Sequence, residues 1–351
     1  MFNAILPRMC EQDQGLRISL LVPCGAHAVS THERILRVPE LPRNLRPSRV
    51  WQHITPSADR LLRYFATDSG TIWHSTYYTL PVRKAAKTVI TVYDMIHERY
   101  PNLFSKRLDD NFRMRKKLAI ERADAVICIS ETTRSDLERF YGTLAKHVTV
   151  IPLGFDRDVF KPLELSDGIA LVAHAVPFLL YIGSRAPHKN FGTLLQAYST
   201  WSTRNHVDLV VVGGPWEPHE EQVLRSRGVS DRVRLLSGVS DLELSRLYCQ
   251  AEALVLPSLY EGFGIPILEA MACGCPIVAS RIPSTIEVAG DCPFYFEPTS
   301  EESLRGALDA ALRQGRASSN VALGLRLCRS YSWEKTASRI LEVYHALSAP
   351  E

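Results

Sequence analysis

Two cationic side chains lie close together in a loop of the second half of the chain, directly after an apolar run. The loop is GSRAPHKN (residues 183–190), and a helix-like pattern starts after Asn190. An Arg side chain can hold phosphate oxygens through two parallel hydrogen bonds, and a Lys side chain supplies a compact positive charge. A helix N-terminus adds backbone N–H groups that favour an anion. Arg185 and Lys189 are therefore candidate phosphate ligands, with a solvated loop as the alternative explanation.

A second loop, PSLYEGFGIPILEAMACG (residues 257–274), contains two carboxylates on either side of a glycine-rich turn. Pro266 suits the first turn of a helix and Gly274 suits the position just after its end, so we expect a helix of about two turns between them. The glycines before the helix allow backbone N–H groups to approach a ligand closely. Glu261 in the loop and Glu269 in the helix can therefore face different parts of one ligand. A capping role would explain one of these carboxylates but not the Gly-Phe-Gly spacing.

A third loop, SGVS (residues 237–240), lies between a predicted strand and a predicted helix and would offer backbone groups to a nucleobase. Together the three loops indicate a site for a nucleotide diphosphate. The chain has neither a GxxxxGK[ST] nor a GxGxxG pattern, which argues against a P-loop NTPase and a standard dinucleotide dehydrogenase. Arg185 and Lys189 could neutralise a departing diphosphate without Mg²⁺, so we expect neither a metal nor a cofactor.

The composition is that of an ordinary globular protein, with 351 residues, 46% of them apolar and 23% charged, and a formal net charge of +3. That length favours about two domains, and the near-balanced charge gives no argument for a nucleic-acid partner. No apolar run approaches the roughly 20 residues that cross a bilayer, and the first residues lack the features of a secretory signal. The eight cysteines include no CxxC pair, so we expect reduced thiols in a cytoplasmic protein.

The second half alternates short apolar runs with segments of helical periodicity, which is typical of a parallel sheet covered by helices on both faces. The predicted strands are 178–183, 207–214, 232–238, 253–258, 276–280 and 293–296. Ser240 and Glu243 form a capping-box pattern at one helix start, and Asn190 is the expected N-cap of another. The three candidate loops all follow predicted strands, as expected for a ligand site at the carboxyl edge of a sheet.

The first half repeats this alternation less regularly. Its predicted strands are 18–23, 71–75, 87–94, 125–130 and 147–153, and Phe2–Met9 is a predicted helix. Residues 39–56 hold four Pro and are expected to form a long loop, whereas 151–162 carries the Gly, Asp and Pro residues of an interdomain hinge. An amphipathic helix is predicted over 333–347. These patterns predict an α/β fold class with two Rossmann-like domains.

The chain resembles the retaining glycosyltransferases of family 4, which have the GT-B fold, with parallel sheets that face each other across a cleft. The resemblance rests on EGFGIPILE (261–269), where seven residues separate two Glu, and on the GSR…HKN loop. Two further matching motifs are IPLGFD (151–156) and IPSTIEVAG (282–290). The domains that the resemblance implies are an acceptor-side domain over 1–155, a nucleotide-sugar-binding domain over 156–332, and a terminal helix, 333–351, that crosses back to the first domain.

Carried over by position, the family's donor site falls on the three loops described above. Arg185 and Lys189 would hold the diphosphate and stabilise its departing charge. Glu261 would contact hydroxyls of the donor sugar, Glu269 would take the ribose hydroxyls, and Val239 would lie near the base. The other donor-side residues that the resemblance implies are Gly183, Ser184, Gly262, Phe263, Gly264 and Ile265. The family generally needs no metal, in agreement with the expectation from the loops.

Two segments of the first half, HSTYY (74–78) and VYDMIHERYP (92–101), resemble acceptor-side loops of the family. Many relatives have His-Asp where this chain has Tyr93-Asp94, so a sugar-contacting His role is not carried over to Tyr93. Asp94 is a candidate for orienting the donor or the acceptor, and with Glu261, Arg185 and Lys189 it completes the candidate catalytic residues. The candidate acceptor-side residues are His74, Tyr77, Asp94 and His97. Ordinary buried or loop polar residues are the alternative explanation for them.

Two features depart from the family or go beyond it. Comparison with the family implies that about twenty residues, which would supply a first strand and a glycine-rich turn, are missing before Phe2, so the first βα unit is incomplete. Either Met1 is a misplaced start, or the chain lacks the glycine loop that normally faces the phosphates. Residues 99–117 carry seven Lys or Arg against two Asp, and they would contact anionic lipid headgroups or a lipid-diphosphate acceptor. A solvated helix face explains the same charges.

These observations predict transfer of a sugar from a nucleotide-diphosphate sugar to a hydroxyl of a saccharide or lipid-linked acceptor, with retention of configuration. The similarity around HSTYY and VYDMIHERYP favours mannose, GDP-mannose as the donor, and bacterial surface polysaccharide as the product. The alternatives are a catalytically impaired nucleotide-binding relative that serves as a partner subunit, and a sugar-nucleotide epimerase. The expected place of action is the cytoplasm or, through peripheral contact, the inner face of the membrane.

Overall fold

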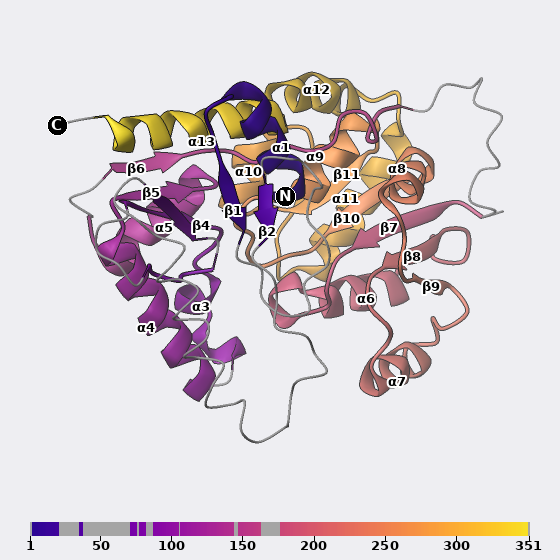
Figure 1. Cartoon of the computed structure of the whole chain (residues 1–351). Coiled ribbons are helices and arrows are strands. Elements are labelled where there is room, and N and C mark those ends of the chain that lie inside the picture. The colour runs from indigo at the N-terminus through magenta and orange to yellow at the C-terminus, as the bar shows by residue number, and fades with distance from the viewer. Residues whose placement is uncertain are drawn as a thin grey trace, which may run out of the picture.

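The structure, a computed structural model, describes residues 2–20, 35–37, 71–75, 77–81, 87–104, 106–143, 147–162 and 176–349. Two helix-covered sheets lie side by side, with most of the first half of the chain at the left of Figure 1 and the second half at the right. The predicted loop at 39–56 and part of the strand predicted at 18–23 lie outside the described residues. The α/β class predicted from the sequence is confirmed.

The first half contains a four-stranded parallel sheet in the order β3-β4-β5-β6. Its strands, all predicted, are β3 (Ile72–Ser75), β4 (Lys87–Val92), β5 (Ala125–Cys128) and β6 (His147–Val150). A separate parallel pair is formed by β1 (Ile18–Leu20) and β2 (Ile35–Arg37), of which only β1 is predicted. The described helices are α1 (Phe2–Gln12), α3 (Ile96–Arg99), η2 (Pro101–Leu103), α4 (Lys106–Arg122) and α5 (Glu131–Tyr141).

The second half contains a six-stranded parallel sheet in the order β12-β11-β10-β7-β8-β9. The six strands are all predicted: β7 (Phe178–Ile182), β8 (Asp208–Val212), β9 (Val233–Leu236), β10 (Ala253–Leu256), β11 (Ile277–Ser280) and β12 (Phe294–Phe296). The helices up to β11 are η3 (Pro187–Lys189), α6 (Phe191–Ser199), α7 (Pro218–Ser226), α8 (Asp241–Gln250) and α9 (Ile265–Ala272). The later ones are α10 (Pro283–Ala289), α11 (Glu301–Gln314), α12 (Ser319–Leu327), η4 (Cys328–Ser330) and α13 (Trp333–Ser348).

The two predicted N-cap residues of this half behave differently. Ser240 and Glu243 form the capping box at the start of α8, because each side chain accepts a hydrogen bond from the other residue's backbone N–H. Asn190 is the N-cap residue of α6, but it has a left-handed φ of 55° and its side chain makes no cap hydrogen bond. Its amide donates instead to the carbonyl oxygens of Pro257 and Pro298, at 3.0 and 2.8 Å. Asn190 therefore joins the loop after β7 to the loop after β10.

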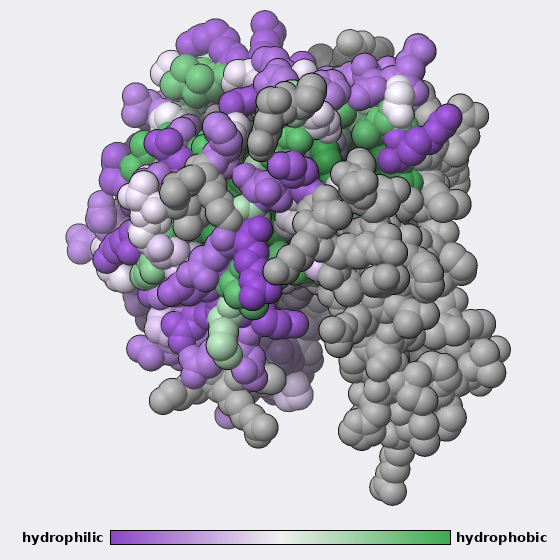
Figure 2. Space-filling model, turned by 60° about the vertical axis from the view of Figure 1, so that its left-hand side comes forward, coloured by the Kyte–Doolittle hydropathy of each residue, from purple (hydrophilic) through white to green (hydrophobic). Residues whose placement is uncertain are grey.

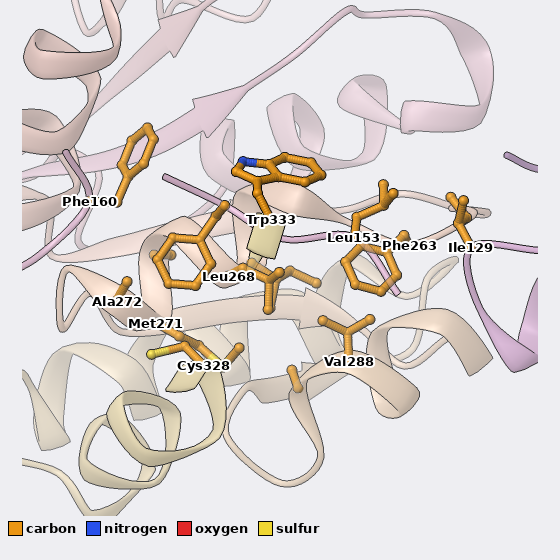
Figure 3. Close-up of a cluster of buried hydrophobic side chains, with 14 of the residues drawn as sticks. Ile129, Leu153, Phe160, Phe263, Leu268, Met271, Ala272, Val288, Cys328 and Trp333 are labelled. Atoms are coloured by element: carbon orange, nitrogen blue, oxygen red, sulfur yellow. The ribbon is translucent and has the colours of Figure 1, made fainter. Parts of the chain in front are cut away.

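One hydrophobic cluster extends across both halves of the chain and through the segment that connects them. Leu153 and Phe160 of this segment belong to it, together with strand residues of the first sheet and side chains of α9 such as Leu268. In Figure 3, Trp333 at the start of α13 lies between Phe160 and Leu153. From there α13 packs along α1, and Arg8 pairs with Glu334. The terminal helix thus packs against a helix of the first half.

The two connections between the halves pass directly against each other at Gly154. An ideal Cβ at this position would overlap the backbone nitrogen of Trp333 and lie 2.8 Å from the carbonyl oxygen of Ser332. Close by, the Arg157 guanidinium donates a hydrogen bond to the carbonyl oxygen of Tyr331 at 2.7 Å. The hinge segment and the start of α13 are therefore held together by backbone contact and by a charged side chain.

We expect Gly154→Ala to lower the free energy of unfolding by about 2–4 kcal/mol, because the added methyl group has no space beside the backbone of Ser332 and Trp333. Urea denaturation followed by circular dichroism measures this change. Gly192→Ala is the matched control, since a Cβ at that position in α6 meets nothing within 4 Å. The control should change the free energy of unfolding by less than about 1 kcal/mol. Equal stability of the two variants would contradict the close contact.

Candidate active site

The three candidate loops of the second half lie at one edge of the six-stranded sheet. They follow β7, β9 and β10, and because all the strands are parallel, their carboxyl ends meet at the same edge. β7 and β10 are direct neighbours, so the loops after them touch. The backbone N–H of Leu259 donates to the carbonyl oxygen of His188 at 2.8 Å. The fold therefore brings together two loops that the sequence singles out.

Lys189 and Glu261 form an ion pair where these two loops meet. The Nζ atom of Lys189 lies 2.7 Å from Oε1 and 2.9 Å from Oε2 of Glu261. Ser258 donates a further hydrogen bond to Oε1 of Glu261 at 2.6 Å, which fixes the orientation of the carboxylate. An ammonium group has three N–H donors, so Lys189 keeps one for an oxygen of a ligand. A cation and a carboxylate are thus presented together at the sheet edge.

Glu269 lies on α9 and contacts α8. The Tyr248 hydroxyl donates a hydrogen bond to Oε2 of Glu269 at 2.8 Å, and the Tyr248 side chain is fully buried. Burial raises the pKa of Glu269 to about 7, although the bond from Tyr248 acts in the opposite direction. Near neutral pH, Glu269 therefore exists in both its charged and its neutral form. The sequence does not single out Tyr248, since a buried tyrosine on a helix carries no signal of its partner.

The glycine-rich turn before α9 has the expected backbone geometry. Gly264 is the N-cap residue with a φ of 103°, which favours glycine, and Pro266 lies in the first turn of the helix. The Phe263 side chain is buried, 5.8 Å from Tyr331 between ring centroids, so its backbone alone can meet a ligand. Ile265 is partly buried against the same core.

The remaining donor-side candidates lie in the other two loops. Gly183 has a φ of 127°, another value that favours glycine. Ser184 is exposed, and its carbonyl oxygen accepts a hydrogen bond from the Tyr181 hydroxyl at 2.6 Å. Val239 is half-buried between β9 and α8. Within the described ranges, no group of three or more His, Cys, Asp or Glu side chains is placed to hold a metal ion.

Arg185 is occupied by groups of the protein itself. It donates to both carboxylate oxygens of Glu220, at 2.5 and 2.9 Å, and to the carbonyl oxygens of Gly214 and Pro215. These bonds use four of the five N–H donors of the guanidinium, which also lies 4.5 Å from the ring centroid of Trp216. Burial opposes ionisation of Glu220, but the bonds from Arg185 help to hold the pKa of this carboxyl below its usual value. The predicted diphosphate contact of Arg185 does not fit this geometry, in which the residue anchors the loop after β7 to the loop after β8.

The glycine-rich loop of the second half rests directly on the first half at Gly262. An ideal Cβ at Gly262 would overlap the carbonyl oxygen of Tyr93 and lie 3.2 Å from Cβ of Asp94. Ser130 Oγ donates a hydrogen bond to the carbonyl oxygen of Gly262 at 2.6 Å, and Thr133 Oγ1 donates to the same oxygen at 3.3 Å. Gly262 is therefore required for this approach, which sets Asp94 against the donor-side loop.

Two further side chains hold this interface, and no sequence pattern predicts their partners. Tyr260 is buried, and its hydroxyl oxygen accepts a hydrogen bond from the backbone N–H of Met95 at 3.0 Å. Glu287 of α10 accepts hydrogen bonds from the backbone N–H groups of Glu131 and Thr132, at 2.6 and 2.8 Å, in the first turn of α5. A carboxylate suits this positive end of the helix dipole. Tyr260 directly precedes the motif 261–269, and Glu287 lies inside the motif 282–290. Their hydrogen-bond partners belong to the first half, so these roles are visible only in the folded chain.

Asp94 approaches the donor-side loops from the first half. Its side chain is half-buried, and its carbonyl oxygen accepts a hydrogen bond from Nζ of Lys116 at 2.7 Å. His188, to which the sequence assigns no role, lies close enough to Asp94, Glu261 and Lys189 for their charges to affect its pKa. Burial and the neighbouring Lys189 lower the pKa of His188, whereas Glu261 and Asp94 act in the opposite direction. Charged groups from both halves therefore converge around His188.

His97 and Tyr77 lie in one aromatic group on the first half. The Nδ1 atom of His97 hydrogen-bonds Oδ1 of Asp109 at 2.5 Å, and the ring stacks with Phe104 at 4.0 Å between centroids. Phe112 connects the two candidates, since its ring lies 4.5 Å from His97 and 5.7 Å from Tyr77. Tyr77 is 68% exposed and is free to meet an acceptor, whereas one nitrogen of His97 is already engaged.

Both ring nitrogens of His74 are engaged by protein groups, so the predicted acceptor contact does not fit its position. Its Nδ1 atom hydrogen-bonds the Tyr344 hydroxyl at 2.5 Å, and its Nε2 atom hydrogen-bonds Oγ1 of Thr91 at 2.7 Å. Burial lowers the pKa of His74 to about 4, so the ring is neutral at pH 7. His74 therefore links β3 and β4 to α13 and has a structural role.

The basic segment 99–117 is less exposed than predicted. Lys116 is buried. Several other cationic side chains of the segment form ion pairs within the first half. These ion pairs are Arg99–Asp136, Arg113–Asp109, Arg113–Asp110, Lys116–Glu98 and, at 3.8 Å, Lys117–Glu121. The side chains of Lys106 and Arg107 lie outside the described residues. Arg115 and Lys117 remain exposed, so the basic face of α4 is smaller than the seven cations of the segment suggest. Over the described part of the chain, no helix is long and apolar enough to cross a membrane.

Comparison with protein families assigns the two halves to one group of enzymes. The family model described as "Glycosyl transferases group 1" matches residues 169–322, which contain the donor-side loops. The model described as "Glycosyltransferase Family 4" matches residues 11–159, which contain Asp94 and the other acceptor-side candidates.

Individual proteins agree with this assignment. O-antigen chain mannosyltransferase B of Escherichia coli is 31% identical over 79% of this chain and 74% of that protein. O-antigen chain mannosyltransferase RfbU of Salmonella typhimurium is 29% identical over 67% of this chain and 63% of that protein. The solved structure of sucrose-phosphate synthase from Thermosynechococcus elongatus superposes with a TM-score of 0.74 at 22% identity, covering 93% of this chain and 86% of that one. With two parallel-sheet halves arranged as in GT-B structures, the chain is a glycosyltransferase and belongs to glycosyltransferase family 4.

Proposed function

We propose that the protein is a retaining glycosyltransferase that moves mannose from GDP-mannose to a hydroxyl group of a saccharide or lipid-linked acceptor. The names of two relatives, both O-antigen chain mannosyltransferases, support the choice of sugar and a role in bacterial surface polysaccharide synthesis. The acceptor would be bound from the side of the first half, near Asp94 and Tyr77. The proposed reaction needs no metal and no cofactor.

The observation that carries the proposal is the Lys189–Glu261 ion pair, with Asp94 of the other half set against the same loop through Gly262. One cation and two carboxylates thus converge at the carboxyl edge of the six-stranded sheet, where such folds bind their ligands. In the proposal Lys189 donates to the diphosphate and Glu261 accepts from hydroxyls of the donor sugar. Glu269 accepts from the ribose hydroxyls, and Asp94 orients the acceptor or the donor sugar.

In the proposed reaction the bond between C1 of the sugar and the diphosphate oxygen breaks, and C1 forms a bond to the acceptor oxygen on the same face. The departing diphosphate takes the proton of the acceptor hydroxyl, so the configuration at C1 is retained. The transition state resembles an oxocarbenium ion. The protein contributes by positioning the reactants and by stabilising the negative charge that develops on the diphosphate. Lys189 supplies that stabilisation from an orientation already fixed by Glu261.

Turnover measurements separate this function from the two alternatives. A transferase consumes GDP-mannose in the presence of a saccharide or lipid-linked acceptor and forms a glycosidic product. An epimerase changes the donor without any acceptor. A partner subunit that has lost activity binds GDP in a calorimetric titration but turns over no donor under either condition.

We expect Lys189→Ala to lower kcat/KM for GDP-mannose by about 100- to 1,000-fold, because the leaving diphosphate loses its fixed cation. We expect Glu269→Ala to weaken GDP binding by at least about tenfold, which calorimetry measures directly. Lys161→Ala removes an exposed lysine of the hinge segment and is the control for loss of one positive charge. Turnover and GDP binding at the parent level in both site variants would rule out this assignment of the donor site.

We propose that Arg185 positions the loop after β7 and does not touch the diphosphate. Since Arg185 and Glu220 are both largely buried, either Arg185→Ala or Glu220→Gln should lower the free energy of unfolding by about 3 kcal/mol. Both variants should weaken GDP binding to the same modest extent. The double variant Arg185→Met/Glu220→Gln should be more stable than the sum of the two single changes implies. A much larger loss of GDP binding in Arg185→Ala than in Glu220→Gln would instead indicate direct contact with the diphosphate.

The exposed face of α4 is the surface through which we propose peripheral contact with an anionic membrane. Met114 and Leu118 lie one turn apart on this helix and are 64% and 40% exposed. Arg115 and Lys117 lie beside them and are also exposed. Figure 2 turns the side of the molecule that carries α4 toward the viewer, where apolar side chains lie among hydrophilic ones. Apolar anchors between basic side chains suit the interface of an anionic bilayer.

We expect the protein to float with liposomes that contain anionic lipid and not with neutral liposomes. Replacing Met114 and Leu118 together by Ser should reduce the floated fraction several-fold, because the apolar anchors are lost. Leu242→Ser is the matched control, since Leu242 is 54% exposed but lies on α8 of the other half. Flotation that ignores the lipid charge, or that survives the double substitution, would contradict contact through α4.

A further inference from the structure

We infer that Tyr248 is a positioning residue of the donor site: its hydroxyl holds one oxygen of Glu269 and leaves the other oxygen for the ribose of a nucleoside diphosphate. The inference rests on the proposed function, in which Glu269 accepts hydrogen bonds from the ribose hydroxyls. Tyr248 lies outside the motifs that carry the family resemblance. Its role therefore comes from its place in the folded chain.

The contact between Tyr248 and Glu269 has a single fixed geometry. The Tyr248 hydroxyl donates to Oε2 of Glu269 at 2.8 Å, from α8 to α9. The Tyr248 side chain is fully buried, and its ring lies 6.0 Å from that of Phe160 between centroids, in a T-shaped arrangement. A ring packed in this way cannot swing its hydroxyl to another partner. The carboxylate of Glu269 is therefore held from one side by an immobile donor.

The backbone around Tyr248 is fixed as well. Arg316 donates hydrogen bonds to the carbonyl oxygens of Tyr248 and Ala251, at 2.8 and 2.5 Å, where α8 ends. One turn earlier, Ser245 Oγ donates to the carbonyl oxygen of Val159 in the hinge segment at 2.8 Å. Because these bonds tie α8 to its surroundings, the Tyr248 hydroxyl keeps its position relative to α9.

The second oxygen of Glu269 is left available for a ligand. In the part of the chain that the structure describes, Oε1 of Glu269 makes no hydrogen bond, and the side chain is half-buried. A carboxylate can accept several hydrogen bonds, and an ionised one accepts them most strongly. The two vicinal hydroxyls of a ribose are suitable donors for this oxygen.

The charge of Glu269 depends on the hydrogen bond from Tyr248. Burial raises the pKa of Glu269 to about 7, the bond from Tyr248 lowers it, and Asp241 at the start of α8 raises it. Burial also raises the pKa of Tyr248 well above its usual value, and Glu269, Cys273 and Cys275 act in the same direction. Tyr248 therefore stays protonated and donates, while Glu269 gains its charge as the pH rises through about 7. Without the hydroxyl, Glu269 would remain neutral to a higher pH.

Tyr248→Phe tests this role, because it removes the hydroxyl and keeps the ring. The probes are GDP and UDP, titrated calorimetrically into the full chain from about pH 6 to about pH 9. In the parent protein, nucleotide binding should strengthen as the pH rises through about 7. In Tyr248→Phe this rise should move upward by about one pH unit, so that Kd weakens about fivefold at pH 7 and hardly changes at pH 9. In turnover assays, KM for the donor should rise while kcat at saturating donor stays unchanged.

Tyr198→Phe is the matched control for loss of a buried hydroxyl. Tyr198 lies in the same half, in a different hydrophobic cluster, and its hydroxyl donates to the carbonyl oxygen of Val207 at 2.8 Å. This variant should lose stability to a similar extent but keep the parent's pH profile of nucleotide binding. An upward move of that profile in Tyr198→Phe would overturn the specific role of Tyr248.

Glu269→Gln distinguishes failure of the inference from failure of the proposed function. It should weaken nucleotide binding and remove the pH dependence near 7. Parent-like binding by Glu269→Gln would overturn the ribose contact, and the proposed donor site with it. Weakened binding by Glu269→Gln together with a parent-like pH profile of Tyr248→Phe would overturn the positioning role alone.

Discussion

The geometry of the candidate site depends on backbone contact at Gly262. Any side chain there would overlap the carbonyl oxygen of Tyr93, so glycine alone lets the donor-side loop lie on the first half. At the same contact the carbonyl oxygen of Gly262 accepts a hydrogen bond from Ser130 at 2.6 Å. At the same interface, Glu287 caps α5 from the other half. These hydrogen bonds from side chains to backbone groups join the two halves beside the candidate site.

Most of the second half follows from its sequence, because each strand of a helix-covered parallel sheet is buried on both faces. Runs such as 178–182 and 253–256 are therefore almost continuously apolar, and their ends can be recognised. The same rule brings the candidate loops together, since parallel strands end at one edge. Lys189 and Glu261 lie 72 residues apart in the chain. They meet because β7 and β10, the strands that precede their loops, are neighbours in the sheet. Strand β2 has the sequence ILR, and two apolar residues followed by an Arg do not form such a continuous apolar run.

Side-chain partners across elements could not be predicted in this way. Arg185 has the type and the position of a phosphate ligand, but packing of α7 places Glu220 against it. His74 lies in an acceptor-like motif, but its environment is completed by Tyr344, which is 270 residues later in the chain. In both cases the local sequence specifies a polar group at the correct sheet edge. Packing of another helix, α7 for Arg185 and α13 for His74, then decides whether that group faces a ligand or the protein.

The exposure of the two cations in the loop after β7 explains why they differ in what they can bind. The Arg185 side chain is 8% exposed and shares a bidentate pair with a carboxylate that is 12% exposed. Replacing that carboxylate by a diphosphate would leave a buried negative charge unpaired, which costs about 3–5 kcal/mol. The Lys189 side chain is 26% exposed, and its partner Glu261 is 20% exposed and also bonded to Ser258. Water and Ser258 can support Glu261 while Lys189 turns a free N–H toward a phosphate oxygen. Of the two cations, Lys189 is therefore the one that can meet an incoming anion without breaking the fold around it.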